Sequence, residues 1–365
     1  MINFKKIALI IQATLFLLGT VFAQYSNADE LKVIATIKPI HSILAGLMEG
    51  IEQPQLLIDE SPYRFKPDAT IQTRLAQSDL IVWIGPELEA SLQAPLSTLP
   101  AKVKVIELLS NPSLKILSKR YDDNRRDPYF WLDTRNALIL VDELALALID
   151  VDPVRSHLYK KNRRNVRLLL RKLDRELEYG YRGLQDGVGY LYHDTQQYFE
   201  QAYALKTGGE LLDTPDAVAD AAKLIKLRSQ LAEGDFNCLL TEKNMPNRYL
   251  DLLVPQNSSQ VWELDSLGQQ FEAGADLYIK MMEYNSSVIK QCLKVNGGTL
   301  ERIDSALAEK QAGVSDVGRF IMINHLGEVV TERDMRGKYQ LLFFGYTSCP
   351  DVCPLSLHTL TSALD

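Results

Sequence analysis

Two cysteines near the end of the chain have the type and spacing that most plainly suggest chemistry. Cys349 and Cys353 lie in the stretch CPDVCP, and each is followed by a proline. They come directly after the apolar run QLLFFGY, which predicts a buried strand, so the two thiols lie at the turn that follows it. Such a pair can hold a metal ion or be reversibly oxidised. The choice between metal binding and redox chemistry depends on what the rest of the chain does.

Length and charge limit the possible functions. The chain has 365 residues, enough for two or three hydrophobic cores. Its formal net charge is −7, and because Lys5 and Lys6 supply +2 near the N-terminus, the remainder carries about −9. This charge argues against nucleic acid as a general partner and suits an acidic protein that attracts cations.

The first 23 residues, MINFKKIALIIQATLFLLGTVFA, have the pattern of a cleaved secretory signal. A short basic region precedes an apolar run that ends in small residues, and we expect cleavage after Ala23. The alternative is an uncleaved membrane anchor, since the run is nearly long enough to span a bilayer. We expect a soluble exported protein in the periplasm, where disulfides persist.

Apolar runs alternate with helical patterns on either side of one long polar stretch. Fully buried parallel strands are predicted at 33–38, 80–85 and 103–108, and further strands at 189–194, 204–211, 237–242 and 259–265. Helices are predicted at 39–49, 68–78, after Asp133, at 214–232 and at 274–293. The pattern is that of an α/β protein with two lobes.

The long stretch opens at Pro153 and continues to about Gly180 with no internal glycine or proline. Its apolar residues recur at helical spacing among many arginines and lysines. We favour one long helix with a solvated basic face over a helix that binds nucleic acid or a membrane surface. This helix would join the two lobes.

These patterns divide the chain into six parts. They are a signal peptide at 1–23, a first α/β lobe at 24–152, a linking helix at 153–184, a second α/β lobe at 185–294, a polar linker at 295–317 and a last segment at 318–365. In the last segment, FIMI and VVT flank a turn and predict a hairpin.

From 33 to 293 the chain resembles the periplasmic solute-binding proteins of zinc and manganese ABC transporters, most closely the zinc-uptake (ZnuA-type) branch. The matching stretches are ATIKPIHSILAGLMEG, SDLIVWIGPELEASL, DPYFWLDTRNA, YHDTQQYFEQAY, LLTEKN and ELDSLGQQFEAGADLY, in the order and spacing of the family. The resemblance implies the TroA-like fold of two α/β lobes bridged by a long helix. It also implies a monomer without catalytic residues, which holds a metal ion between the lobes and passes it to a membrane permease.

The resemblance implies four metal-site positions, and two of them depart from the family pattern. The family has three histidines and a carboxylate. Here His193 in YHDTQQYF and Asp265 in ELDSLG are retained, whereas Tyr63 in SPYRFKP and Tyr129 in DPYFWLD replace the other two histidines. The histidine-rich loop of many zinc-uptake members is also absent from 110–127.

Two phenols in place of two imidazoles change the chemistry of the site. A phenol has a pKa near 10 and must lose its proton to ligate well, so this oxygen-rich set suits ferric iron better than zinc. Three hypotheses stay open: a different metal, weak zinc or copper binding through His193 and Asp265 with water, or tyrosines that plug a cleft without metal.

The other two cysteines are Cys238, in the strand NCLLTE, and Cys292, near the end of the last helix of the second lobe. The resembling zinc-uptake proteins can carry a disulfide at these places, and an oxidising compartment favours one here. The alternative is two inert buried thiols.

From about 318, the chain resembles the start of the SCO/SenC family of thioredoxin-like copper chaperones, in GRFIMINHLGEVVTERDMRGKYQLLFFGYTSCPDVCPLSL. In that family two thiolates, matched here by Cys349 and Cys353, bind copper with a distant histidine, because soft thiolates select Cu(I). His358 does not occupy that position. Since 318–365 is about a third of such a domain, we expect a truncated module that is not stable alone.

The sequence therefore predicts a metal-binding component of a transporter, not an enzyme, fused to an SCO-like module. The alternative is a copper or redox delivery factor whose two lobes serve as a degenerate scaffold. A thiol–disulfide enzyme is a weaker hypothesis, because the cysteine pair is CxxxC and its domain is incomplete.

Overall fold

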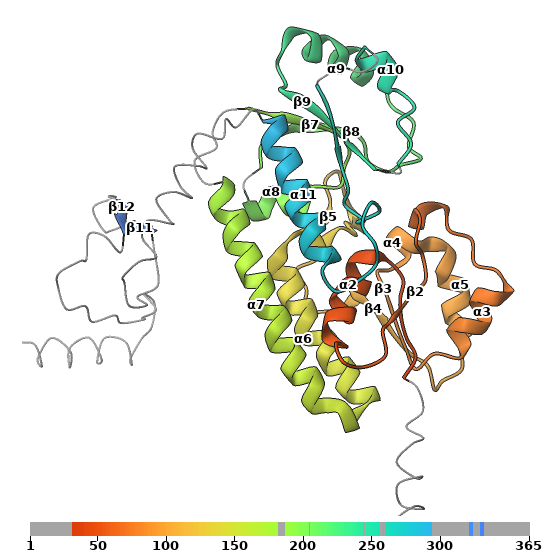
Figure 1. Cartoon of the computed structure of the whole chain (residues 1–365). Helices are drawn as coiled ribbons and strands as arrows, with labels where there is room; N and C mark the ends of the chain where they lie inside the picture. The colour runs from red at the N-terminus through yellow and green to blue at the C-terminus, as the bar shows by residue number, and fades with distance from the viewer. Residues whose placement is uncertain are drawn as a thin grey trace, which may run out of the picture. The chain divides into compact units, whose positions relative to one another are not determined.

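The computed structural model describes residues 31–181, 187–203, 205–243, 245–255, 258 and 260–293, and the backbone of 321–323 and 329–331. The chain divides into two compact units, residues 1–297 and 298–365, and the first unit contains both lobes (Figure 1). The predicted signal peptide, the linker at 295–317 and the Cys349–Cys353 pair lie outside the described residues. No helix of the described part is both long enough and apolar enough to cross a membrane.

The first lobe is built on a four-stranded parallel sheet in the order β2-β1-β3-β4. Its strands are β1 (Val33–Ala35), β2 (Gln55–Leu56), β3 (Leu80–Trp83) and β4 (Lys104–Glu107). Its helices are α2 (Lys38–Leu47), α3 (Ala69–Ala76), α4 (Pro86–Glu89), α5 (Gln93–Ser97) and α6 (Thr134–Val151). Every residue of β1 and β3 is buried, as continuous apolar runs in a parallel sheet predict.

The long helix α7 (Ser156–Tyr181) joins the lobes, as the sequence predicts. It begins after a 3-10 turn at Pro153–Arg155, where the Asp152 carboxylate accepts a hydrogen bond from the Arg155 backbone N–H. Its buried side, which includes Tyr159, Leu170 and Leu173, packs on α2 and α6 of the first lobe, and the helix also contacts α8 and α11 of the second lobe (Figure 1). The helix therefore braces both lobes.

The second lobe has a parallel sheet of four strands in the order β10-β9-β7-β8. Its strands are β7 (Gly189–His193), β8 (Thr207–Leu212), β9 (Cys238–Glu242) and β10 (Val261–Leu264). Its helices are α8 (Gln197–Tyr203), α9 (Ala221–Glu233), α10 (Leu250–Leu253) and α11 (Leu277–Cys292). Read from β8, the strand order repeats that of the first lobe, so both lobes share one topology.

A disulfide joins Cys238 at the start of β9 to Cys292 at the end of α11, with Cα atoms 5.5 Å apart. The bond closes a loop with a sequence separation of 54 residues. On the chain-entropy model, a loop of this size stabilises the fold by about 4 kcal/mol. The disulfide thus ties the last helix to the central part of the second sheet.

A two-stranded hairpin of the first lobe, β5 (Ser118–Lys119) and β6 (Asp122–Arg126), reaches the second lobe. The Arg120 guanidinium at its turn bonds the carboxylates of Asp194 at 3.0 Å and Glu200 at 2.8 Å. The sequence pattern did not predict these strands, because their residues are polar and do not alternate. Ion pairs with the other lobe hold the hairpin in place.

Two further elements compare with the sequence predictions. The helix predicted at 214–232 begins later, at Ala221, because the Asp220 side chain caps it by accepting from the Lys223 N–H, and residues 214–217 form a turn instead. In the second unit, β11 (Ile321–Ile323) pairs antiparallel with β12 (Val329–Thr331), which confirms the predicted hairpin.

Candidate metal centre

The ends of the second-lobe strands place several polar side chains at one edge of the sheet. His193 is the last residue of β7, Glu242 is the last residue of β9, and Asp265 directly follows β10. Because the three strands are parallel neighbours, their carboxyl ends meet at the same edge. This edge is where open parallel sheets bind ligands.

His193 is the least satisfied polar side chain at this edge. The residue is 2% exposed, and neither ring nitrogen makes a hydrogen bond within the described part of the chain. Burial lowers the pKa of His193 to about 4, and the neighbouring Pro246 backbone offsets part of that effect. The ring is therefore neutral at physiological pH, which is the state that ligates metal ions.

Asp265 is held in place by its own loop and by the last helix. Its two carboxylate oxygens accept hydrogen bonds from the backbone N–H groups of Gln269 at 2.7 Å and Gln270 at 2.9 Å. Gly268 permits this turn with a φ of 70°, a conformation that side chains with a Cβ disfavour. Asn285 on α11 pairs with the Asp265 backbone. Each carboxylate oxygen keeps acceptor capacity for another partner.

Glu242 fixes the two loops that flank the site, a role that the sequence analysis missed. Its carboxylate accepts from the Thr195 hydroxyl at 2.5 Å, the Gln196 amide at 3.1 Å, and both the hydroxyl and N–H of Ser266 at 2.7 and 3.0 Å. Burial raises its pKa. The signal that could have found it is its position at the end of β9, between the strands that carry His193 and Asp265.

The first lobe contributes two tyrosines that bond each other. The hydroxyl oxygens of Tyr63 and Tyr129 are 2.8 Å apart. Tyr129 is buried next to Trp131, and Tyr63 keeps part of its surface exposed. Burial raises the pKa of both phenols well above 10, and the nearby carboxyl groups of Glu242 and Asp127 raise it further. Both phenols therefore keep their protons at neutral pH.

Asp127 is a buried carboxylic acid on the first-lobe side, where Tyr63 and Tyr129 lie. Its carboxylate accepts a hydrogen bond from the Tyr129 N–H at 3.0 Å. Burial raises the pKa of Asp127 to about 7, and Asp194 across the lobe boundary adds to the effect. The tyrosine side is thus surrounded by acids whose pKa values are raised, which favours neutral, protonated groups there.

Hydrogen bonds connect the two sides. The Trp131 indole N–H donates to the Ser266 carbonyl at 2.9 Å, which ties the DPYFWLD stretch to the loop after Asp265. Lys38 at the start of α2 donates to the Gln269 and Phe271 carbonyls. These bonds hold the first lobe against the Asp265 loop.

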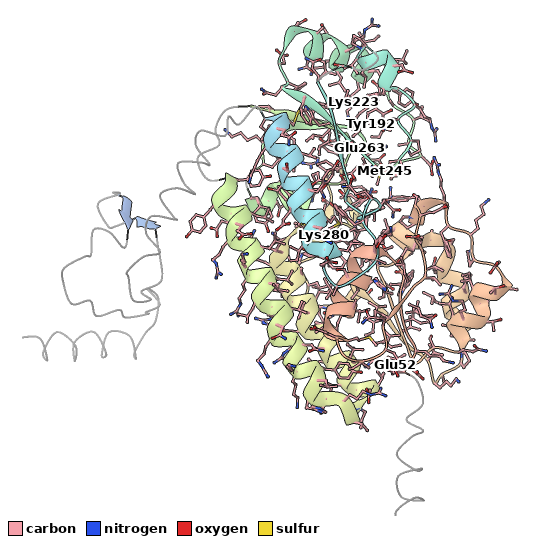
Figure 2. The ribbon with its side chains drawn as sticks, in the orientation of Figure 1. Glu52, Tyr192, Lys223, Met245, Glu263 and Lys280 are labelled. Carbon is pink, nitrogen blue, oxygen red and sulfur yellow. A yellow bond between two sulfur atoms is a disulfide. The ribbon has the colours of Figure 1, made fainter. Side chains whose placement is uncertain are left out.

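A cavity of about 450 Å³ lies between the lobes and is lined by Glu60, Ser61, Arg64, Met245 and Pro246. Figure 2 shows Met245 on the part of the second lobe that is nearer the first. In the sequence, Tyr63 lies between Ser61 and Arg64, which line one wall. Pro246 lines the other wall, and its backbone raises the pKa of the His193 ring. The cavity therefore lies beside residues of both lobes, although Tyr63, Tyr129, His193 and Asp265 are not among its lining residues.

The structure joins some of the predicted ligands and leaves others apart. Tyr63 and Tyr129 are in direct contact, and both lie close enough to Glu242 for its charge to raise their pKa values. Asp265 likewise raises the pKa of Glu242. No hydrogen bond of the described residues links His193 to the other three. Among the described His, Cys, Asp and Glu side chains, no three lie close enough together to hold a metal ion.

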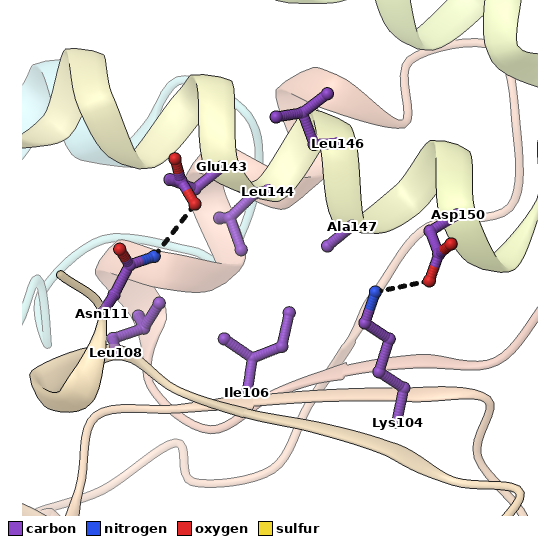
Figure 3. Close-up of a pocket in the computed structure, with 9 residues that line it drawn as sticks. All are labelled: Lys104, Ile106, Leu108, Asn111, Glu143, Leu144, Leu146, Ala147 and Asp150. Atoms are coloured by element: carbon purple, nitrogen blue, oxygen red, sulfur yellow. Dashed lines mark hydrogen bonds and ion pairs between the residues drawn. The ribbon is translucent and has the colours of Figure 1, made fainter. Parts of the chain in front are cut away.

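A second cavity of about 450 Å³ lies between β4 and α6 (Figure 3). Its polar side chains pair across it, Lys104 with Asp150 at 2.7 Å and Asn111 with Glu143 at 3.2 Å. Apolar side chains such as Ile106 and Leu144 lie between these pairs. With its charged groups already paired, this cavity is a poorer candidate for an ion than the interlobe centre.

A family model described as "Zinc-uptake complex component A periplasmic" matches residues 33–292. The chain belongs to this zinc-uptake family. Among curated proteins, it is 25% identical over 335 residues to the high-affinity zinc uptake system protein ZnuA of Brucella abortus, covering 79% of this chain and 99% of that protein. It is 24% identical to the protein of the same name from Haemophilus ducreyi, covering 80% and 99%.

Solved structures share the fold of this zinc-uptake family member. The solute-binding protein FpvC of Pseudomonas aeruginosa, in complex with Mn²⁺, matches with a TM-score of 0.63 at 18% identity, over 74% of this chain and 100% of that one. The periplasmic zinc-binding protein TroA of Treponema pallidum matches with a TM-score of 0.62 at 19% identity, over 72% and 99%. The TroA-like, two-lobed α/β fold predicted from the sequence is confirmed.

A second family model, SCO1/SenC, matches residues 308–365. The predicted fusion of a zinc-uptake component with an SCO1/SenC segment is therefore confirmed. Cys349 and Cys353 fall within this match, although they lie outside the described residues.

Proposed function

We propose that this protein binds a divalent transition-metal ion between its lobes, with zinc as the first choice and copper as the alternative divalent ion. His193 supplies the nitrogen ligand, and Asp265 supplies a carboxylate oxygen. The observation that carries the proposal is the buried, neutral His193 ring, whose two nitrogens make no hydrogen bond of ordinary geometry with the described residues, although the Pro246 backbone lies near the ring. Buried polar atoms without partners are rare in folded proteins, and an ion is one of the explanations.

In this proposal Tyr63 and Tyr129 close the first-lobe side and do not ligate as phenolates. Burial raises the pKa of both phenols and favours the protonated form, and their mutual hydrogen bond adds to this effect at Tyr129 and offsets part of it at Tyr63. Each unit by which a phenol pKa is raised adds about 1.4 kcal/mol to the free energy of removing its proton. A strongly acidic ion such as Fe³⁺ could meet that cost and give an oxygen-rich site, so a ferric titration is a necessary comparison.

The wider role follows from the family. The curated relatives are named as components of zinc uptake systems, and the family description places its members in the periplasm. We propose that the protein is exported to the periplasm and carries its ion to an ABC transporter permease in the inner membrane. It acts as a monomer and not as an enzyme.

The test is a zinc titration against a chromophoric chelator, with full-length protein carrying Cys349→Ser and Cys353→Ser to remove the thiol pair. We expect one zinc ion per chain, and loss of that binding in His193→Gln. The matched control is His157→Gln, because His157 is an exposed histidine of α7. Zinc binding that survives His193→Gln, or no zinc binding by the parent protein, would overturn the proposal.

The thiol pair supports a second role. We infer from the SCO1/SenC match that Cys349 and Cys353 bind Cu(I) as thiolates, because soft sulfur ligands select that ion. The test is a competition between the full chain and a Cu(I) chelator. Loss of one copper per chain in Cys349→Ser/Cys353→Ser supports this role, and unchanged copper binding excludes it.

A further inference from the structure

The long helix α7 carries a strongly basic face on an acidic protein. Between 156 and 181 it has eight basic residues and three acidic ones, whereas the whole chain has a net charge of −7. The basic residues are Lys160, Lys161, Arg163, Arg164, Arg167, Arg171, Lys172 and Arg175. Such a concentration of one charge invites a partner of the opposite charge.

Some of these cations are already neutralised within the protein. Asp142 on α6 pairs with both Arg163 and Arg167, and Lys172 has an exposed partner in Glu176 at 3.7 Å. Asp174 does not offset the others, since it accepts hydrogen bonds from the Thr134 and Tyr203 hydroxyls on the side that faces α6 and α8.

Five cations remain exposed and form no ion pair with any residue that the structure describes. They are Lys160, Lys161, Arg164, Arg171 and Arg175. The spacing from 161 to 164, 171 and 175 keeps most of them on one side of the helix, opposite the buried Leu170, Leu173 and Leu177. At 1.5 Å per residue, this face extends over about 22 Å. It is therefore long, straight and cationic.

Two large exposed apolar side chains accompany this cationic face: Leu168 lies among the cations, and Leu169 lies about 100° further round the helix, beside the face. Leu168 is 65% exposed and Leu169 is 57% exposed. No contact within the lobes explains leucines here, since α7 buries its other side against α2, α6 and α11 (Figure 1). Exposed leucines between lysines and arginines are the composition of helices that lie in a membrane interface.

We propose that α7 is a docking face for anionic phospholipid headgroups, with Lys161, Arg164, Arg171 and Arg175 against the phosphates, Leu168 inserted among them and Leu169 at the edge of the contact. The sequence pattern alone favours a solvated face, and the exposed leucines and unpaired cations argue for lipid instead. Exposed leucines would gain from burial in a bilayer, whereas contact with an acidic protein surface needs only the cations. This inference goes beyond the proposed metal binding and does not depend on it.

The test is co-sedimentation of the full-length exported protein with vesicles of phosphatidylcholine alone or with about one third phosphatidylglycerol. We expect binding only to the anionic vesicles, and loss of most of it at 0.5 M NaCl, because salt screens such contacts. The test variant replaces Lys161, Arg164, Arg171 and Arg175 with Gln. The control makes the same charge change at exposed residues away from α7, with Lys66, Lys102, Lys226 and Arg228 each replaced by Gln.

At about 1 kcal/mol for each basic side chain near an anionic surface, removal of these four cations should weaken binding by up to about a thousandfold. Leu168→Ala/Leu169→Ala should weaken vesicle binding by about tenfold, and the salt dependence of the remaining binding should stay the same. Equal losses in the α7 variant and the control, or equal binding to both vesicle types, would overturn the proposal. So would retention on heparin without vesicle binding, which would indicate a polyanion instead. Zinc binding should be the same in all these variants.

Discussion

The two lobes bring different chemistry to the centre between them. On the first-lobe side, Tyr63 and Tyr129 satisfy each other with a 2.8 Å hydrogen bond, and their pKa values are raised. On the second-lobe side, His193 has a lowered pKa and no partner among the described residues, while Asp265 is oriented by two backbone N–H groups. The first side is satisfied without an ion, whereas the second, in our proposal, accepts one.

The two sides also differ in the elements that carry them. The second-lobe residues stand at the ends of strands, where the sheet fixes their positions. The tyrosines lie on short turns, in η1 (Pro62–Arg64) and just before η4 (Phe130–Leu132).

The largest effect on zinc affinity should come from giving the first-lobe side histidines in place of its two tyrosines. We expect Tyr63→His/Tyr129→His to raise zinc affinity by about a thousandfold, since even groups that only support zinc ligands contribute ten- to hundredfold each. Chelator competition measures the change. Tyr121→His is the matched control, because Tyr121 is an exposed tyrosine of the interlobe hairpin. An unchanged affinity in the double variant would mean that the tyrosines do not face the ion.

His193 and Asp127, one from each side, should respond to pH with opposite sign. The folded-state pKa of His193, about 4, lies below its usual value of 6.5, so the unfolded chain binds the proton more tightly and stability falls as pH drops through this window. The folded-state pKa of Asp127, about 7, lies above its usual 3.8, so its contribution is lost as pH rises through that window.

We therefore expect His193→Gln to remove an acid destabilisation of up to about 3 kcal/mol, and Asp127→Asn to remove an opposite trend of similar size. Urea unfolding of metal-free protein at pH 4.5 and pH 7 measures both. Glu89 lies away from the centre, and burial raises its pKa to about 7. Its contribution to the pH dependence is the same in the parent and in both variants, so it cancels when they are compared. If the free energy of unfolding of both variants changed with pH as it does in the parent, the opposite roles of His193 and Asp127 would be contradicted.

A smaller effect on the free energy of unfolding should show whether the hydrogen bond between the two tyrosines contributes beyond the packing of their rings. Tyr63→Phe and Tyr129→Phe should each destabilise the protein by about 1 to 2 kcal/mol, because each leaves a phenol without its partner. The double variant should cost less than the sum, with a coupling of about 1 kcal/mol in a double-mutant cycle. Thermal unfolding gives these values. Strict additivity would show that the hydrogen bond does not contribute.

Much of the fold could be predicted because it depends on local patterns. The runs KVIATI and LIVWIG became the buried strands β1 and β3, and the glycine-free stretch after Pro153 became α7. The hairpin β5–β6 could not be predicted, because ion pairs between Arg120 and distant carboxylates define it. The sequence pattern places the start of α9 too early for a local reason, because the cap at Asp220 sets the beginning of the helix and the helical pattern before it does not show this.

The sequence could place the candidate ligands along the chain but could not predict their contacts. His193 and Asp265 follow from motifs at strand ends, whereas the supporting role of Glu242 appears only when Thr195, Gln196 and Ser266 are seen around it. The hydrogen bond between Tyr63 and Tyr129 likewise joins residues 66 positions apart. A sequence pattern carries no information on such a distance.

The most direct test of the central claim is ¹⁵N nuclear magnetic resonance of the histidine rings during zinc addition. The chain has five histidines, so the ring signals are few, and His193→Gln assigns the one that matters. With Cys349→Ser/Cys353→Ser protein, the account predicts that one equivalent of zinc shifts a single ring nitrogen, that of His193, while Tyr63→Phe/Tyr129→Phe gives the same shift. A His193 signal unmoved by zinc, or a shift that requires the tyrosines, would contradict it.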